Sequence, residues 1–306
     1  MQFLVGLMVF CIVLFIYLHV NYHLRTSDDL EVFEVDQPSK DKLEEVCDLR
    51  QPVLFDYSSE NLDTVCLQTS LQDSYGAFDV RIRDLQLSDD AKEELYIPLP
   101  FANARRVLQD DASSRYVLES NADFLEETGI GKEYRIADGF IRPHMVSSCV
   151  YDITMGSEGA CTPLRYDLNY RNYYLVTEGE VTIKLAPPRS SKHLHEQRDY
   201  ENFEFKSLIN PWDVQSNYRS DFDKVKCLEI TLKKGQLLHL PAYWWYSVRY
   251  GKGATLCTLK YMTYMNTVAI TPKLFMRFLQ LQNVKRQTAP LAKDHLVTEK
   301  TPADTE

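Results

Sequence analysis

The chain has 306 residues, a hydrophobic content of 44% and a formal net charge of −10, with a pI near 5.3. Such an acidic chain lacks the basic face that neutralises phosphates, so its composition argues against nucleic-acid binding. The many aromatic residues are better explained by packing within strands than by a surface that stacks bases.

The N-terminal segment predicts a membrane anchor over residues 1–20. It contains the uncharged run FLVGLMVFCIVLFIYL, which is close to the shortest length that crosses a hydrocarbon core of roughly 30 Å. A cleaved signal peptide is the alternative, although no Lys or Arg precedes the run and no small-x-small cleavage site follows it. Because the bases Arg25, Lys40 and Lys42 follow the run, the positive-inside rule predicts that the bulk of the chain is cytoplasmic.

Beyond the anchor, the polar and acidic residues 21–38 predict a stalk, and Ser39 is a candidate N-cap for a helix over DKLEEVCDL. Further helices are expected at SDDAKEEL, at PFANARRVL and at NADFLEET, where Gly129 provides the stop signal.

Most of the remaining chain predicts short strands, rich in β-branched and aromatic residues and bounded by turn residues. These segments are QPVLFDY, DTVCLQTSL, GAFDVRIRDL, SCVYDITM, NYYLVTEGEVTIKL, CLEITLKKGQLLHLP, WYSVRY and TLCTLKYMTYMN. Many short strands after a helical N-terminal part indicate a mainly β, double-sheet jelly roll with flanking helices over residues 39–271. The polar residues 189–226 are expected to form an insert over the mouth of the barrel.

The C-terminal part predicts one helix and a tail. Over residues 272–286 a helix would place Leu274, Phe275, Phe278 and Leu279 on one face, either to cap the barrel or to form a homodimer surface. Residues 287–306 are polar and without periodicity, which predicts a disordered tail.

Two segments carry a family resemblance: TPLRYDLNYRNYYLVTEGEVTIKLAPP (Thr162 to Pro188) and KKGQLLHLPAYWWYSVRY (Lys233 to Tyr250). They resemble the JmjC-like cupins, in particular the asparaginyl-hydroxylase-like 2-oxoglutarate oxygenases related to the hypoxia-factor inhibitor. In that family the first segment reads Thr-Pro-x-His-x-Asp and the second ends in Trp-Trp-His. The resemblance extends through QPVLF and covers roughly residues 40–270. It implies a double-stranded β-helix, the cupin jelly roll.

The same resemblance implies a metal site that has degenerated here. Family members hold Fe(II) with two His and one carboxylate. The two histidine positions are Arg165 and Tyr246 in this chain, and only Asp167 remains. A guanidinium has five donors and no acceptor, and a neutral phenol is a poor ligand. We therefore expect no bound metal, and His239 is the one candidate for a rescued site with Asp167.

The co-substrate positions are also altered. The family's lysine for 2-oxoglutarate falls on Val181, and strand alternation predicts that the nearby Lys184 points to the opposite face. Thr162 and Asn172, two lesser contributors to that site, are retained.

Without a metal, Asp167 would be a buried, unpaired charge, which is costly. We expect Arg165, two residues away on the same face of the strand, to supply the compensating charge, and Tyr246 to donate a further hydrogen bond. The alternative is that Arg165 reaches solvent and Asp167 stays hydrated.

These residues predict a membrane-anchored cupin domain that has lost dioxygenase activity and acts as a binding or scaffold module. A protein or peptide ligand would lie in a groove beside Trp244 and Trp245. No cofactor is expected. The alternatives are an active Fe(II)/2-oxoglutarate-dependent protein hydroxylase or demethylase with an unorthodox metal site, and a purely structural membrane protein.

Overall fold

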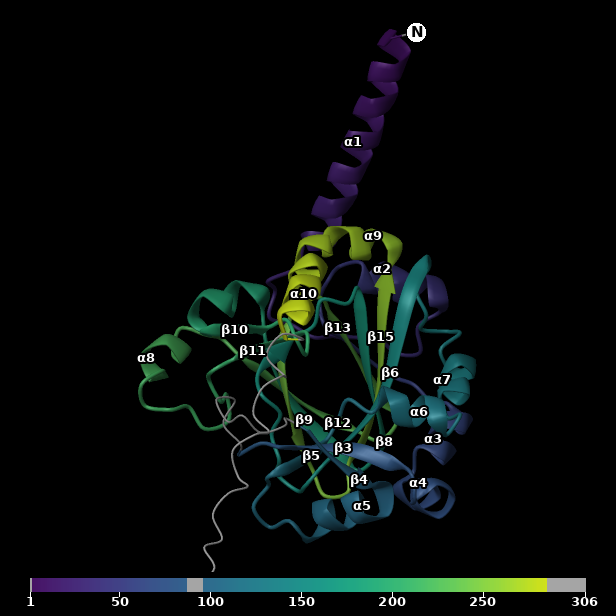
Figure 1. Cartoon of the computed structure of the whole chain (residues 1–306), viewed down its shortest axis with the longest axis vertical. Coiled ribbons are helices and arrows are strands. Elements are labelled where there is room, and N and C mark those ends of the chain that lie inside the picture. Colours follow the sequence, from purple (N-terminus) through teal and green to yellow (C-terminus); the bar gives the residue numbers. More distant parts are fainter. Residues whose placement is uncertain (1, 87–95, 285–306) are drawn as a thin grey trace, which may run out of the picture.

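The computed structural model describes residues 2–86 and 96–284. It begins with α1 (Gln2–Leu24), which projects away from the rest of the molecule (Figure 1). The mean hydropathy of its most apolar window is 2.7, and that window is not buried by the domain. α1 is long and apolar enough to cross a bilayer, two properties that signal sequences share. The helix ends at Leu24 rather than at residue 20 as predicted.

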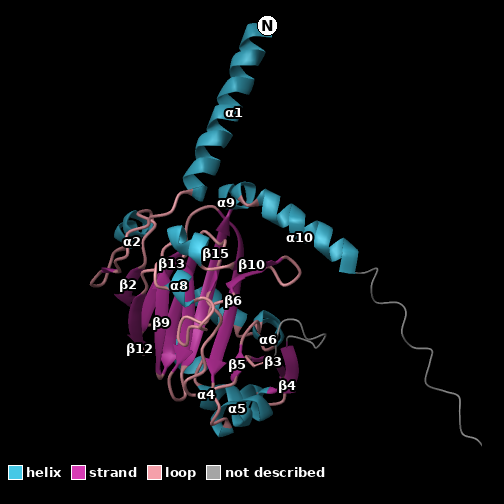
Figure 2. Ribbon diagram, turned by 90° about the vertical axis from the view of Figure 1, so that its left-hand side faces the viewer, coloured by secondary structure: helices cyan, strands magenta, loops and turns pink. Residues whose placement is uncertain are grey.

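The domain is built from two facing β-sheets, whose strands run side by side in Figure 2. The major sheet has the order β1 (Phe33–Glu34), β2 (Val53–Asp56), β13 (Gln236–Pro241), β8 (Arg171–Glu178), β15 (Thr255–Thr263), β6 (Val146–Gly156), β5 (Tyr116–Leu118), β3 (Asp79–Asp84), β4 (Tyr96–Pro100). The minor sheet has the order β10 (Glu196–Asp199), β11 (Glu204–Ser207), β7 (Arg165–Tyr166), β14 (Trp245–Tyr250), β9 (Glu180–Ala186), β12 (Leu228–Lys233). This confirms the predicted double-stranded β-helix.

Strand alternation decides which side chains enter the space between the sheets. On β8 the even-numbered Tyr174 and Val176 join the core between the sheets, while Tyr173 and Leu175 join a second core on the other face of the major sheet. The β8–β9 hairpin turns at Gly179, where φ is 70° and a Cβ would lie 2.8 Å from the Cα atom of Ala254. Only glycine fits this turn without strain.

Helices from the N-terminal half pack against the outer core of the major sheet. They are α2 (Lys40–Cys47), α3 (Glu60–Val65), α4 (Gln68–Tyr75), α5 (Phe101–Asp110), α6 (Ala122–Glu127) and α7 (Gly131–Ala137). The predicted cap of α2 is confirmed, because Ser39 Oγ accepts a hydrogen bond from the Lys42 amide. The predicted helices at PFANARRVL and NADFLEET are present as α5 and α6, whereas SDDAKEEL lies outside the described residues.

One predicted strand is wrong, because DTVCLQTSL forms parts of α3 and α4 instead. Its buried residues Cys66 and Leu71, together with Leu62 just before the segment, are spaced as on a helical stripe and enter the outer core. The β-branched residues that suggested a strand are exposed or half-buried.

The predicted stalk is also wrong, since its second half belongs to the domain. Phe33 and Glu34 form β1, which pairs in parallel with β2. Asp28 accepts a hydrogen bond from the Arg189 amide at 2.9 Å, and Asp29 accepts one from the Gln51 amide group at 3.0 Å. The polar side chains that suggested a solvated linker are thus used to attach the segment to the body.

The expected insert over residues 189–226 contains the 3₁₀ helix η1 (Pro188–His193), the β10–β11 hairpin and α8 (Arg219–Phe222). The hairpin extends the minor sheet. After β15 the chain forms α9 (Tyr264–Ala269) and α10 (Thr271–Val284). α10 leaves the body sideways from the end where α1 joins it (Figure 2). It does not cap the barrel, because Phe275, Phe278 and Leu279 are exposed. The expected disordered tail, residues 287–306, lies outside the described residues.

Candidate functional site

The degenerate metal positions meet between the two sheets. Arg165 on β7 and Tyr246 on β14 are direct cross-strand partners in the minor sheet. Asp167 follows β7 and Lys260 lies on β15 of the major sheet. Arg165, Asp167 and Lys260 line one pocket of about 140 Å³, which we call the mouth pocket. Its other lining residues are Tyr96, Glu119, Ser120, Asp152, Tyr166, Asn202, Phe203, Glu204 and Phe205.

Asp167 is held by an ion pair and two phenols. Lys260 Nζ lies 2.8 Å from Asp167 Oδ2, and the same oxygen accepts hydrogen bonds from Tyr246 at 2.9 Å and Tyr174 at 3.0 Å. Burial alone would raise the pKa of Asp167, but Lys260, the charge of Arg165 and the hydrogen bond from Tyr246 together outweigh burial and hold the pKa below its usual value. Burial and the neighbouring Asp167 raise the pKa of both phenols, so both stay neutral and donate.

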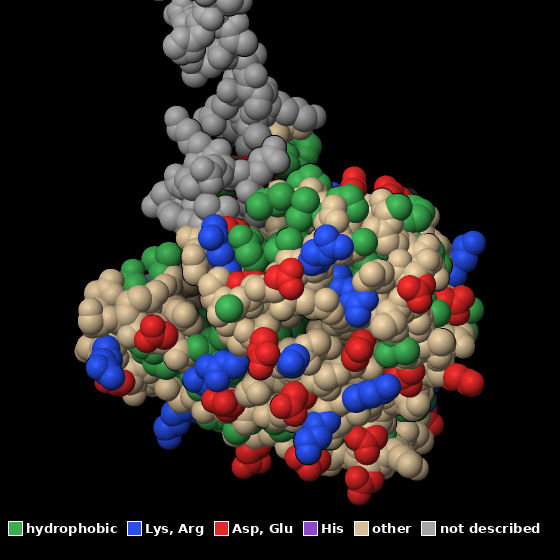
Figure 3. Space-filling model, turned by 90° about the horizontal axis from the view of Figure 1, so that it is seen from below, with side chains coloured by type: hydrophobic (Ala, Val, Ile, Leu, Met, Phe, Trp, Pro, Cys, Tyr) green, Lys and Arg blue, Asp and Glu red, His purple; other side chains and the backbone are tan. Residues whose placement is uncertain are grey.

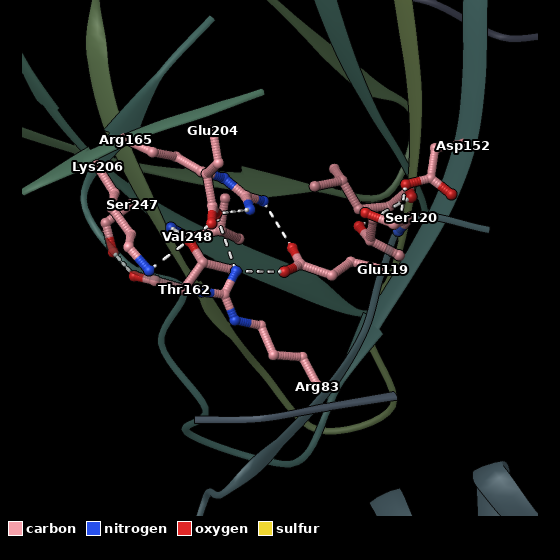
Figure 4. Close-up of polar contacts among 12 residues, drawn as sticks. Arg83, Glu119, Ser120, Asp152, Thr162, Arg165, Glu204, Lys206, Ser247 and Val248 are labelled. Atoms are coloured by element: carbon pink, nitrogen blue, oxygen red, sulfur yellow. Dashed lines mark hydrogen bonds and ion pairs between the residues drawn. The ribbon is translucent and has the colours of Figure 1, made fainter. Parts of the chain in front are cut away.

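Arg165 belongs to a separate ring of four charged side chains (Figure 4). Its guanidinium contacts Glu119 at 2.7 Å and Glu204 at 3.2 Å, and Arg83 contacts the same two carboxylates at 3.0 and 2.8 Å. Burial acts to raise the pKa of Glu119, but the two arginines lower it to about 2. Two cations and two anions close the ring, so its formal charges cancel.

The prediction that Arg165 pairs with Asp167 is therefore wrong, because Arg165 has other partners. Arg165 does face the same pocket as Asp167, and its charge helps to lower the pKa of that carboxyl, but its hydrogen bonds go to Glu119 and Glu204. The alternative, a solvated Arg165, is wrong too, since the side chain is 17% exposed. The predicted hydrogen bond from Tyr246 to Asp167 is confirmed.

Sequence reasoning missed Lys260 and Glu119. The sequence did contain a signal for Lys260. In the segment TLCTLKYMT it lies on the same inward face as the buried Leu256 and Thr258, and a lysine on a buried face is usually paired with an acidic side chain. Glu119 directly follows β5 and is 3% exposed, but nothing in the local sequence indicates that it meets Arg83 and Arg165.

The three co-substrate positions now have structural partners. The Thr162 hydroxyl accepts a hydrogen bond from the Val248 amide at 2.9 Å, and Ser247 Oγ donates to the Thr162 carbonyl (Figure 4). Asn172 donates to the Leu240 carbonyl at 3.1 Å and is the cross-strand partner of Lys260. Its Oδ1 atom is buried without a hydrogen-bond partner. Val181 is buried in the core between the sheets.

Lys184 points to the opposite face, as strand alternation predicted. Its ammonium lies 4.4 Å from the centre of the Trp212 ring and donates to the Pro211 carbonyl at 3.1 Å, on the outer side of the minor sheet. It cannot replace the missing lysine of the co-substrate site from there.

Trp244 and Trp245 do not line a groove, which corrects the expectation placed on them. They are 1% and 0% exposed, and their indole nitrogens donate to the Arg50 carbonyl and to Ser191 Oγ. Both rings fill cores next to β14, and the open space lies instead beside Arg165, Asp167 and Lys260.

His239 is not brought to Asp167. It is the cross-strand partner of Tyr173 on β8, and Tyr173 faces the outer core, whereas Tyr174 faces Asp167. The imidazole is buried on the far side of the major sheet, where burial and the nearby Arg171 and Arg50 lower its pKa well below the usual value. Over residues 2–86 and 96–284, no group of three His, Cys, Asp or Glu side chains is placed to hold a metal ion.

The donor set at the barrel centre does not fit Fe(II). Iron in such sites needs imidazole and carboxylate lone pairs. Here Arg165 offers only N–H donors, Tyr246 is a protonated phenol, and the ammonium of Lys260 already occupies the side of Asp167 where a cation would bind. No step of oxygen chemistry can be assigned to these residues.

Two facing, mainly antiparallel sheets with this buried polar centre define a protein of the cupin class. The family profile described as the cupin-like domain matches residues 33–266, and the chain belongs to that family. A segment of 95 residues is 32% identical to HSPB1-associated protein 1 of rat, of mouse and of cattle. That segment is 31% of this chain and 20% of each relative, so the chain matches only about a fifth of their length.

Proposed function

We propose that this chain is a membrane-anchored cupin-like domain that has lost Fe(II)/2-oxoglutarate dioxygenase activity and acts as a binding or scaffold module. The observation that carries the proposal is the ion pair at the barrel centre, where Lys260 Nζ lies 2.8 Å from Asp167. An ammonium that neutralises the one remaining ligand removes the electrostatic attraction for a metal ion. Arg165, held by two carboxylates, adds a second fixed positive charge.

The membrane anchor of this proposal is α1. Its apolar surface is not covered by the domain, and its length matches a bilayer core. In the alternative, a signal sequence, α1 would be removed during maturation. The N-terminus of the mature protein distinguishes the two, because an anchor stays on the chain and a signal peptide does not.

The binding role concerns the mouth pocket. Curated relatives are named for association with HSPB1, and we propose that this chain likewise acts through a protein partner. A cavity of about 140 Å³ is suited to one polar side chain of the partner rather than to a long segment. The formal charges of the four-residue ring and of the Lys260–Asp167 pair cancel. Asp152, whose pKa burial raises to about 6, is the remaining acid of the pocket, and Lys206, 3.9 Å from Glu204, is a further buried cation beside the ring. The pocket therefore favours a neutral hydrogen-bonding group.

The decisive experiment measures metal content, 2-oxoglutarate binding and succinate formation on the purified full chain in detergent. We expect no stoichiometric iron after incubation with Fe(II), no shift in melting temperature with 2-oxoglutarate and no succinate above background. One equivalent of tightly held iron together with 2-oxoglutarate turnover would establish the alternative, an active oxygenase with an unorthodox site.

The partner role is tested by photo-crosslinking from position 203, which lines the mouth pocket. An Asn202→Trp substitution in a chain with the crosslinker at position 203 should abolish the adduct by filling the entrance. The matched control is Glu201→Trp, because Glu201 lies in the same turn but does not line the pocket. Equal loss with both substitutions would assign the contact to the hairpin surface and not to the pocket.

A further inference from the structure

An exposed apolar face runs along α9 and α10. It consists of Tyr264, Val268, Phe275, Met276, Phe278 and Leu279, which are 41% to 59% exposed. We call this set the α9–α10 apolar face. Large apolar side chains that cluster on a surface mark a binding site more often than scattered ones do, so the question is what covers this face.

The contacts of α10 with the body fix which way the apolar face points. The ammonium of Lys273 lies 4.9 to 5.3 Å from the ring centres of Tyr243, Phe205 and Tyr166. One turn further on, the Arg277 guanidinium lies 5.0 Å from the Phe203 ring. Because positions 273 and 277 share one side of the helix, Phe275 and Leu279 lie on the opposite side. The apolar face is therefore turned away from the β10–β11 hairpin.

The same end of the molecule receives α1. α1 packs on α9, and His23 at its last turn is buried, with Nε2 lying 3.4 Å from the Thr263 hydroxyl at the N-cap of α9. The Tyr22 ring lies 4.7 Å from the Arg50 guanidinium. These contacts attach the last turn of α1 to the domain, so a bilayer crossed by α1 would end beside α9.

The figures place α9 at the level of that boundary and the start of α10 beside it. In Figure 2 α9 lies at the base of α1, and α10 runs from there obliquely outward and away from α1, above the β10 hairpin. The opposite end of the molecule carries interspersed acidic and basic side chains (Figure 3). One end is thus apolar next to α1, and the far end has the mixed charges of a water-facing surface.

We infer that α9 and α10 lie in the bilayer interface, with the α9–α10 apolar face buried among lipid headgroups and the first acyl carbons. This rests on the proposed anchoring by α1. A helix that exposes Phe, Met and Leu on one side while basic side chains bind the protein on the other is suited to such an in-plane position. Tyr264 and Tyr22 provide the amphipathic rings that favour the membrane–water boundary.

The test uses the full chain in phosphatidylcholine nanodiscs, with an environment-sensitive fluorophore on one cysteine at a time and the other accessible cysteines replaced by serine. The three positions are the native Cys11 on α1, Phe275→Cys on α10, and Lys132→Cys on α7. Lipids with spin labels at shallow and deep acyl positions report depth. We expect quenching at position 11 by deep labels, at position 275 by shallow labels, and none at position 132.

A paired substitution on the helix sharpens the result. Phe278→Ser with Leu279→Ser should reduce the quenching at position 275 at least severalfold and leave position 11 unchanged, whereas Gln280→Ser should change neither. Quenching at position 11 without quenching at position 275 would overturn the inference and leave the anchor intact. Concentration-dependent energy transfer between copies at position 275 would also overturn it, in favour of a second copy. No quenching at position 11 would refute the anchor and the inference together.

Discussion

Lys260 and Asp167 come from opposite sheets of the barrel and meet at 2.8 Å, each side chain about one-fifth exposed. This contact joins β15 to the segment after β7 across the interior, beside the ring formed by Arg83, Glu119, Arg165 and Glu204. A metal ion at Asp167 would have to displace the Lys260 ammonium.

Lys260→Met should lower the free energy of unfolding by about 3 kcal/mol, because the Asp167 carboxylate stays buried without its partner. Adding Asp167→Asn should restore most of the loss, since the double variant has no unpaired charge. Chemical denaturation checks both. Lys42→Met is the control and should cost under about 1 kcal/mol, because Lys42 pairs with Glu45 at the surface. Additive costs at 260 and 167 would contradict the coupling.

Arg165→His alone should not bind iron, because the protonated Tyr246 and the ammonium of Lys260 remain. The combination Arg165→His, Tyr246→His and Lys260→Met provides two imidazoles and frees Asp167, so it should raise the iron content measurably in metal analysis. Stoichiometric iron in the single variant would show that the ligand set has been misidentified.

The ring around Arg165 predicts an acid-sensitive contribution to stability. The two arginines hold the pKa of Glu119 at about 2, below its usual 4.5. A group with a lowered pKa in the folded state stabilises it above the unfolded pKa, and this contribution is lost as the pH falls from about 4.5 to 2. The unfolding free energies of the parent and of Glu119→Gln should therefore converge over that range. A constant difference would exclude ionisation of Glu119 as the cause.

Asp152 predicts that the free energy of unfolding changes with pH in the opposite direction. Burial raises its pKa to about 6, although the Ser120 and Asn121 amides donate to it at 2.9 and 2.7 Å. The folded chain then holds a proton that the unfolded chain has released, so this group's contribution falls as the pH rises from about 4 to 6. Asp152→Asn should abolish this decline of roughly 3 kcal/mol in the free energy of unfolding, as measured by denaturation at several pH values. An unchanged slope in the variant would contradict it.

Lys273 predicts that α10 is attached to the body more stably at alkaline pH. Burial among three rings lowers its pKa to about 8 from 10.5. Since the folded state favours the neutral amine, the contribution of this group to stability should rise as the pH increases from about 8 to 10.5. Lys273→Met should abolish that rise, and Lys273→Ser should increase hydrogen exchange along α10. Equal exchange in parent and Lys273→Ser would contradict the attachment.

Much of the fold was predictable because strands with one buried face leave an alternating pattern. The inward positions of Arg165, Asp167 and Tyr246 follow from it, whereas the hairpin at Gly179 divides a segment that was predicted as one strand. The partners of Arg165 were not predictable, because Glu119 follows β5 and Glu204 lies on β11, and the neighbours of these strands are set by the sheet order and not by local sequence. The prediction that Trp244 and Trp245 line a groove was wrong for a related reason. The family motif indicates where these residues lie in the chain of strands, but not how deeply their rings are buried.

The absence of a loose stalk has a mechanical consequence. A flexible linker of 18 residues would let the domain range over roughly 24 Å from its anchor. Here the Asp28 contact with Arg189 and the pairing of Phe33 with Val53 hold that segment against the body. Under the proposed anchoring by α1, a domain tethered this short has almost no reach, so a partner would meet it at the membrane surface in an orientation set by α1.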